Sequence, residues 1–308
     1  MSLQLSAYSW HPEGDMDKEK IKAWIQGSRP PFFIATLIPI VIGWLAAREH
    51  GLQPQRFLLV LVACFVVHFV TNIANDYFDY IQGTDAGEAI GGSRVIQQGK
   101  ITPSQLGWAI IVLYFIGFLI SLYIVFGLRL YGLAPLILFA FFSSLFYVAP
   151  PIRYGYHGLG ELFVAINMGP VMVVGTYWVI SGVPNLRAFL VSLPVGLMVA
   201  SILYYQSLPD MKTDEAAGKR TLAVRLGKER AYLLLITWLI IIYLTIIALV
   251  VSCILSWLSL LSLLTVPVFI KLIRIVRNTD DWALLDQYGK YVRMLYFLHG
   301  IAIIIGVL

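Results

Sequence analysis

The stretch Asn72-Ile-Ala-Asn-Asp-Tyr-Phe-Asp-Tyr-Ile-Gln-Gly-Thr-Asp85 begins where a long apolar run, Phe57 to Val70, gives way to polar residues. If a helix continues through it, Asn72, Asp76 and Asp79 fall at positions i, i+4 and i+7 and share one face. Carboxylates at a membrane edge are costly unless they are paired, bound to a cation or functional. We therefore interpret this stretch as half of a divalent-metal site.

The composition identifies the chain as a polytopic membrane protein. Of its 308 residues, 59% are hydrophobic and 13% are charged, and the mean hydropathy is +0.81. A soluble domain carries a charged fraction of about 25%. The net charge of +5 does not require nucleic acid as a partner, because the placement of the basic residues along the chain explains it.

The apolar runs predict an all-α fold with nine transmembrane helices, each near the roughly 20 residues that a bilayer core requires. We expect residues 1–29 to form an N-terminal segment and residues 30–308 a single nine-helix domain. An alternative count of eight interprets the last long run before residue 271 as one tilted helix, because only Ser252, Cys253 and Ser256 interrupt it. The nine predicted spans are 30–49, 56–75, 104–123, 131–149, 158–181, 186–206, 231–250, 252–270 and 291–308.

The basic residues favour nine spans and indicate an orientation. With nine spans, 18 of the 22 Lys and Arg residues lie on the side of the N-terminus. Such a bias predicts that the N-terminus and the acidic stretches face the cytoplasm, in an integral protein of the cell membrane. Eight spans would instead place the five cations after Ile270 outside. The opposite side holds only Arg48, Arg56, Arg129 and Arg187.

A second acidic pair follows the sixth span as the first follows the second span. Asp210 and Asp214 are spaced i, i+4, and an even number of spans separates them from Asp76 and Asp79. Both pairs should therefore emerge on the same side of the membrane. Mg²⁺ usually binds through one or two carboxylates together with substrate phosphates, so two facing Asp pairs could hold Mg²⁺ ions around a diphosphate. Nearby basic residues would neutralise more of that charge: Arg94, Lys100, Lys212, Lys219 and Arg220.

Two simpler interpretations of the acidic residues stay open. They could cap helix ends, or they could pair with the nearby cations. The following Gly218-Lys-Arg-Thr221 lacks the spacing of a phosphate-binding loop. A short amphipathic segment from Thr221 to Leu226, ended by Gly227, fits that sequence better.

These motifs resemble the UbiA superfamily of intramembrane prenyltransferases. The resemblance rests on Asn72-x3-Asp76-x2-Asp79 and on Asp210-x3-Asp214 with the Ala-Gly-Lys-Arg-Thr-Leu-Ala that follows it. The resemblance extends from about residue 22 to the C-terminus. The motif sequences are most similar to those of the MenA-like branch, which prenylates 1,4-dihydroxy-2-naphthoate. Further matching stretches are Ser28-Arg-Pro30, Gly92-Ser-Arg-Val-Ile96 and Tyr147-Val-Ala-Pro-Pro-Ile-Arg-Tyr-Gly-Tyr-His-Gly-Leu-Gly-Glu161.

The resemblance implies a Mg²⁺-dependent transfer of a polyprenyl group from its diphosphate to an aromatic acceptor, with no obligate protein partner. It implies nine helices around a central cavity capped by the two Asp-bearing loops. Matched by position, the metal and diphosphate set is Asn72, Asp76, Asp79, Asp210 and Asp214, with Asp85 as a further member. Tyr147 and Arg153 would flank the prenyl diphosphate. Arg29, Arg94 and Lys212 would lie against the diphosphate.

One departure from the family pattern concerns the acceptor. The family usually carries an Arg directly before the first Asp of the second motif, and Pro209 stands there in this chain. A non-aromatic acceptor such as a glycerol-phosphate lipid is therefore an alternative. Outside this class, a cation-coupled transporter would also use membrane carboxylates, but it predicts acids nearer the bilayer midplane.

Three residues near the predicted site could have a purely structural role instead of a role in substrate binding. Tyr147 could belong to an interfacial aromatic belt, and Glu161 could be a favourable charge at a helix N-terminus. His68 is more often a helix-packing residue than a ligand.

Overall fold

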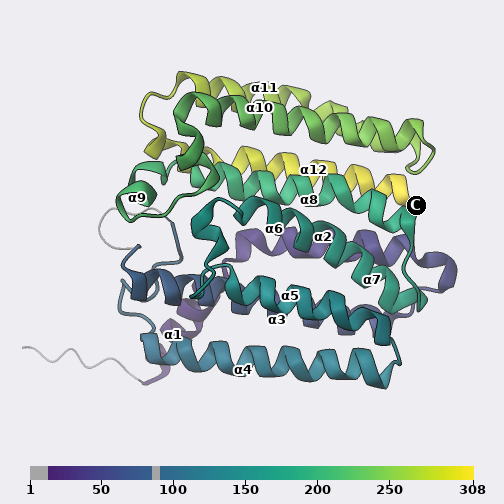
Figure 1. Cartoon of the computed structure of the whole chain (residues 1–308), viewed down its shortest axis with the longest axis horizontal. Coiled ribbons are helices and arrows are strands. Elements are labelled where there is room, and N and C mark those ends of the chain that lie inside the picture. The colour runs from purple at the N-terminus through teal and green to yellow at the C-terminus, as the bar shows by residue number, and fades with distance from the viewer. Residues whose placement is uncertain (1–12, 85–90) are drawn as a thin grey trace, which may run out of the picture.

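The computed structural model describes residues 13–84 and 91–308, and within these residues it contains helices and connecting segments only. The long helices run side by side, with α10 and α11 along one flank of the bundle and α4 along the other (Figure 1). The α-helices are α1 Glu13–Ser28, α2 Phe33–Ala46, α3 Pro54–Gln82, α4 Pro103–Leu122, α5 Ala134–Phe146, α6 Gly160–Ile166, α7 Met172–Ser181, α8 Leu186–Ser207, α9 Met211–Ala216, α10 Leu222–Val251, α11 Val266–Asn278 and α12 Gly289–Val307.

Shorter 3₁₀ and π segments connect or extend these helices. The 3₁₀ segments are η1 Pro30–Phe32, η2 Arg48–His50, η4 Tyr131–Leu133, η5 Tyr154–His157, η7 Trp257–Thr265 and η8 Trp282–Tyr288, and the π segments are η3 Tyr123–Gly127 and η6 Asn167–Val171.

The predicted all-helical membrane architecture is confirmed. In the described part of the chain, eight helical segments are long and apolar enough to cross a membrane, and a ninth, Tyr131–Phe146, is apolar but shorter. The chain is thus an integral, multi-pass membrane protein. The alternative that merged the seventh and eighth spans is wrong, because α10 ends at Val251 and η7 begins at Trp257. Between them the backbone N–H of Ser256 donates to the carbonyl of Gly306, 2.9 Å away.

The second span is longer than predicted and carries the first acidic motif. Helix α3 continues to Gln82, seven residues beyond the predicted end, and stops at Gly83, whose φ of 73° is the left-handed C-cap conformation. Asp76 and Asp79 therefore lie on the last turns of a helix, and the loop begins only after them. Helix α10 has its own irregularity at Gly227 (φ 72°), which confirms the predicted end of the amphipathic segment there.

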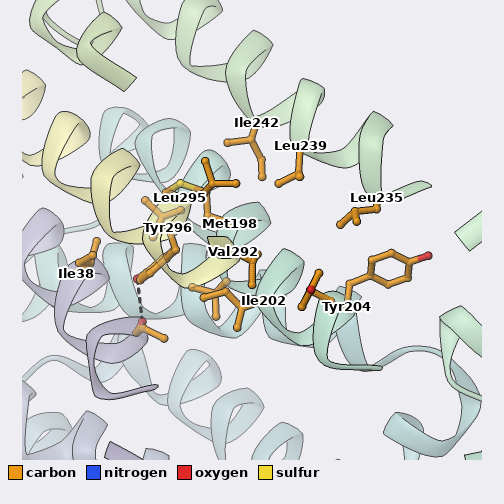
Figure 2. Packing of buried hydrophobic residues seen from close by; sticks show 14 of the residues in the cluster. Ile38, Met198, Ile202, Tyr204, Leu235, Leu239, Ile242, Val292, Leu295 and Tyr296 are labelled. Atoms are coloured by element: carbon orange, nitrogen blue, oxygen red, sulfur yellow. Dashed lines mark hydrogen bonds between the residues drawn. The ribbon is translucent and has the colours of Figure 1, made fainter. Parts of the chain in front are cut away.

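The largest buried apolar cluster joins α2, α8, α10 and α12. Figure 2 shows side chains of three helices gathered in this cluster: Met198 and Ile202 of α8, Leu239 of α10 and Leu295 of α12. The hydroxyl of Tyr296 on α12 also donates to the carbonyl oxygen of Ala35 on α2, at 3.2 Å. Such packing and interhelical hydrogen bonds hold membrane helices together.

A close approach between backbones fixes α8 against the fifth span. A Cβ atom on Gly196 of α8 would lie 2.2 Å from the carbonyl oxygen of Ala165 in α6. On the facing π segment, a Cβ on Gly169 would lie 2.8 Å from the Cα atom of Gly196. Small residues allow this contact. It positions α8, whose C-terminal end leads into the second acidic motif.

Candidate active site

The carboxylate of Asp76 is buried and bound on both oxygens. It is 3% exposed, and it accepts hydrogen bonds from the Arg29 guanidinium and from the hydroxyl and backbone N–H of Ser93, the latter at 3.1 Å. Arg29 comes from the turn between α1 and η1, and Ser93 from the segment after α3. Two connecting segments therefore meet on Asp76.

The carboxylate of Asp79 lies one turn further along α3 and is 2% exposed. The Tyr156 hydroxyl donates to one of its oxygens, and the Lys219 ammonium lies 3.8 Å from the other. The Thr84 and Tyr156 hydroxyls lie 2.9 Å apart, so the residue that follows the C-cap of α3 is tied to η5. Burial and the charge of Asp79 raise the pKa of Tyr156, which therefore stays protonated as a donor.

The second acidic motif meets the first through Lys219. Asp210 is the N-cap residue of α9 and Asp214 lies within that helix. The Nζ atom of Lys219 lies 3.7 Å from a carboxylate oxygen of Asp214, as well as close to Asp79. The backbone N–H of Arg220 donates to the carbonyl of Tyr156 at 2.9 Å, which holds this segment against η5. The two motifs thus share one end of the bundle, the end at which α9 lies in Figure 1.

The electrostatics of Asp214 favour binding of a cation. Burial raises the pKa of Asp214 to about 6, the Lys219 ammonium opposes that shift, and the charges of Asp210 and Asp79 add to it. Several carboxylates are therefore held close together in a poorly solvated place.

The donor set fits Mg²⁺ that shares its coordination with a substrate. No three Asp, Glu, His or Cys side chains in the described residues converge into a complete ligand group for one ion. Mg²⁺ in proteins often keeps waters and binds through one or two carboxylates plus substrate phosphates. Asp79, Asp210 and Asp214, spread along one cavity wall, suit that mode better than an all-protein cage.

A large cavity opens from the carboxylates into the bundle. Its volume is about 1280 Å³, and its polar end is lined by Asn72, Asp79, Asp210, Asp214 and Lys219. Along α3 the lining continues from Asp79 to Val60, which spans roughly 28 Å at the rise of an α-helix. Beyond the polar end the walls are mainly aliphatic and aromatic side chains from α3, α4 and α5. The site is therefore a charged head joined to a long apolar arm.

Several residues predicted from the sequence lie at this cavity. Asn72 lines it, and its side-chain amide donates to the carbonyl of Ser28 at 3.1 Å. Tyr147 lines it next to Gly160, where a Cβ would lie 3.5 Å from the Tyr147 hydroxyl. Arg29 also lines the cavity, whereas Asp76 lies behind Arg29 and Ser93 and does not.

Other predicted residues are not gathered at the polar end. Lys212 has a side chain that is 88% exposed, lies 3.7 Å from Asp281 and is not part of the cavity wall. Arg153 donates to Gln82 at 2.6 Å and lies over the ring of Tyr156. Arg94 is half-buried and is not part of the cavity wall. Asp85 lies outside the described residues.

The sequence interpretation missed the neutral donors that hold the carboxylates. Ser93 and Tyr156 lie in stretches that support the family resemblance, but no spacing rule connects them to Asp76 or Asp79. Glu161 and His68 also line the cavity, and Glu161 is only 4% exposed. In the sequence, Glu161 is a single carboxylate at the start of a helix. Such a residue can either line a cavity or stabilise the helix N-terminus, and the sequence does not distinguish these roles.

Comparison with known proteins places the chain in a family. The profile of the UbiA prenyltransferase family matches residues 36–295. The chain is 32% identical to the 1,4-dihydroxy-2-naphthoate octaprenyltransferase of Haemophilus influenzae over 267 residues, which cover 83% of this chain and 86% of that protein.

Solved structures show the same fold. A UbiA homolog from Aeropyrum pernix K1 superimposes with a TM-score of 0.66 at 18% identity, covering 90% of this chain and 98% of that one. A UbiA homolog from Archaeoglobus fulgidus bound to GPP and Mg²⁺ superimposes with a TM-score of 0.59 at 14% identity, covering 92% and 99%. The chain belongs to the UbiA prenyltransferase family and is a membrane-embedded prenyltransferase.

Proposed function

We propose that this enzyme transfers a long polyprenyl group from its diphosphate to 1,4-dihydroxy-2-naphthoate, with Mg²⁺ as cofactor, in the synthesis of a menaquinone-type quinone. One observation carries the proposal: Asp79 and Asp214 meet at the polar end of a cavity whose apolar arm runs roughly 28 Å along α3. A charged head with an apolar tail is the shape of a prenyl diphosphate. The naphthoate as acceptor is supported by relatives with that activity in their names, such as that of Haemophilus influenzae.

In this proposal the carboxylates hold the donor substrate through metal. Asp79, Asp210 and Asp214 contribute oxygens from the cavity wall, Asn72 lies beside them, and Asp76 anchors Arg29. Bound Mg²⁺ would neutralise the charge that builds on the departing diphosphate and so assist cleavage of the allylic C–O bond.

The basic and aromatic residues complete the proposed chemistry. Arg29 and Lys219 add positive charge at the polar end, where the diphosphate would leave. Tyr147 and Tyr154 line the cavity close to this end, so their ring faces can stabilise the allylic cation before the electron-rich acceptor captures it. The surrounding apolar walls exclude water from that cation.

The bias of Lys and Arg residues supports a cytoplasmic location for this end of the bundle. Both substrates would then enter from the cytoplasmic face or from the adjacent leaflet.

Product masses from purified protein test the proposal. The protein is incubated with Mg²⁺ and a series of prenyl diphosphates, each offered with 1,4-dihydroxy-2-naphthoate, 4-hydroxybenzoate or a glycerol-phosphate lipid. The proposal predicts a prenylated naphthalene product for long-chain donors: the allylic C–O bond to diphosphate breaks, a C–C bond to the ring forms, and the product mass shows whether a ring proton or CO2 leaves. Prenylation of the glycerol-phosphate lipid alone would contradict it.

A further inference from the structure

Three Lys or Arg side chains in the described residues line the cavity, and they differ in how they are paired. Arg29 is bound to Asp76, and Lys219 lies between Asp79 and Asp214. Arg293 on α12 has no hydrogen bond or ion pair within the described part of the chain. Its guanidinium lies over the ring of Phe32, with the guanidinium carbon 5.7 Å from the ring centroid.

The fold holds Arg293 at the same end of the cavity as the acidic motifs. Arg293 lies in the second turn of α12, and the Tyr205 hydroxyl of α8 donates to the carbonyl of Leu285, just before that helix, at 2.9 Å. The end of α8 then supplies Gln206 to the cavity wall, and the segment after it supplies Asp210. Arg293 therefore reaches the polar end from a third element, separate from both Asp motifs.

Space for the guanidinium is provided by a glycine one turn earlier. A Cβ atom on Gly289 would lie 3.1 Å from Nη1 of Arg293 and 3.9 Å from the ring of Tyr205. A larger residue at position 289 would therefore push on the guanidinium. The glycine leaves room for the Arg293 side chain, which lies over the Phe32 ring and lines the cavity.

No carboxylate in the described residues forms an ion pair with Arg293. Asp286 also lines the cavity but is not within ion-pair distance of Arg293. A half-buried guanidinium without an acceptor is unfavourable, and its planar fork is well suited to a bidentate contact with a carboxylate. The two other cavity cations are already paired, Arg29 with Asp76 and Lys219 with Asp79 and Asp214.

We propose that Arg293 binds the carboxylate of the aromatic acceptor and so positions the acceptor ring against the allylic carbon. The inference rests on the proposed function, since 1,4-dihydroxy-2-naphthoate carries that carboxylate. It also accounts for Pro209: the second motif supplies no cation directly before Asp210, and α12 supplies one to the same cavity.

The test compares two acceptors that differ only in the carboxylate. Arg293→Gln and wild type are assayed with varied 1,4-dihydroxy-2-naphthoate or 1,4-dihydroxynaphthalene at saturating prenyl diphosphate and Mg²⁺, and then with varied prenyl diphosphate at saturating acceptor. Loss of a hydrogen bond to a charged group predicts an increase of about 10-fold or more in the KM for the naphthoate. The KM for the prenyl diphosphate and the rate with the naphthalene diol should stay within about twofold of wild type, since those contacts do not involve Arg293 in this proposal.

Two further variants serve as controls for Arg293→Gln. Lys290→Ala removes an exposed cation one turn earlier on α12, which lies over Tyr291 and outside the cavity wall, and it should leave both KM values unchanged. Arg293→Lys keeps the charge without the planar fork and should recover part of the affinity for the naphthoate.

The outcomes separate the inference from the proposed function. An unchanged KM for the naphthoate in Arg293→Gln, or an increase in the KM for the prenyl diphosphate instead, overturns the inference and leaves the proposed function intact. A wild-type protein that prenylates neither naphthalene compound overturns the proposed function, and the inference falls with it.

Discussion

Asp79 and Asp214, which come from opposite halves of the chain, share a single ammonium group. The Nζ atom of Lys219 lies 3.8 Å from an oxygen of Asp79 and 3.7 Å from an oxygen of Asp214. Lys219 is 21% exposed, so this contact is poorly screened by solvent. The ion pairs hold α3 and α9 together at the place where we propose that a diphosphate binds.

Replacing Lys219 with Met should therefore reduce catalysis strongly. We expect kcat/KM for the prenyl diphosphate to fall roughly 100-fold, which is typical when one donor to a developing anion is removed. Lys212→Met is the matched control, because Lys212 is 88% exposed and lies near Asp281 outside the cavity. Steady-state kinetics of both variants measure the difference. Equal losses in the two variants would contradict the role proposed for Lys219.

The Tyr156 hydroxyl should matter through the carboxylate that it orients. Tyr156→Phe removes the donor to Asp79 and the contact with Thr84 while keeping the ring under Arg153 and Lys219. A hydrogen bond to a charged group contributes about 1.5–3 kcal/mol, so we expect roughly a 10-fold higher Mg²⁺ concentration for half-maximal activity. A Mg²⁺ titration of the variant, beside a thermal unfolding curve, measures this. An unchanged Mg²⁺ requirement would argue against the orienting role.

The helical spans and the meeting of the two acidic motifs could be predicted from the sequence. Runs of apolar residues near the bilayer length are a strong signal, and the even number of spans places both motifs on one side. The sequence allows a helix through Asn72 to Gln82 but does not define its end, because polar and apolar residues alternate irregularly there and the burial of Asp76 and Asp79 depends on contacts with distant segments.

The sequence also does not predict which basic side chains point into the cavity. Lys212 lies within the six-residue helix α9 and Lys219 three residues after its end, and spacing does not tell which of them faces the cavity. Packing of α9 against the rest of the cap decides it: Lys219 reaches Asp79 and Lys212 reaches Asp281. Long-range contacts of this kind require the tertiary structure.

The apolar arm of the cavity should control which donors are used. Gly117 on α4 lines the arm, and a Cβ there would lie 3.6 Å from Val66, which is roughly 20 Å along α3 from Asp79. Gly117→Leu should therefore lower activity with long-chain prenyl diphosphates while sparing geranyl diphosphate. Phe115→Leu on the outward face of α4, where Phe115 is 59% exposed, is the control. A competition assay between short and long donors measures the ratio, and an unchanged ratio in Gly117→Leu would contradict this placement of the tail.

The contact between α8 and the fifth span should be sensitive to one methyl group. Gly196→Ala places a Cβ 2.2 Å from the carbonyl oxygen of Ala165, so the two helices must separate. Overpacking of this kind costs about 1–3 kcal/mol. Gly175→Ala is the matched control, because its Cβ would lie 3.5 Å from the Leu136 side chain, an ordinary contact. Thermal unfolding of the detergent-solubilised variants should show a lower Tm for Gly196→Ala only.

Two measurements together test the central claim most directly. The first is whether prenyl transfer requires Mg²⁺, and the second is whether transfer is lost when single carboxylates are neutralised. Purified wild-type protein, Asp79→Asn and Asp214→Asn are assayed with a long-chain prenyl diphosphate and 1,4-dihydroxy-2-naphthoate, in Mg²⁺ and in EDTA, with thermal unfolding as the folding control. We predict wild-type transfer in Mg²⁺, no transfer in EDTA, and a loss of about 100-fold or more in each folded variant. Full activity of the wild type in EDTA, or wild-type rates in both variants, would contradict the account.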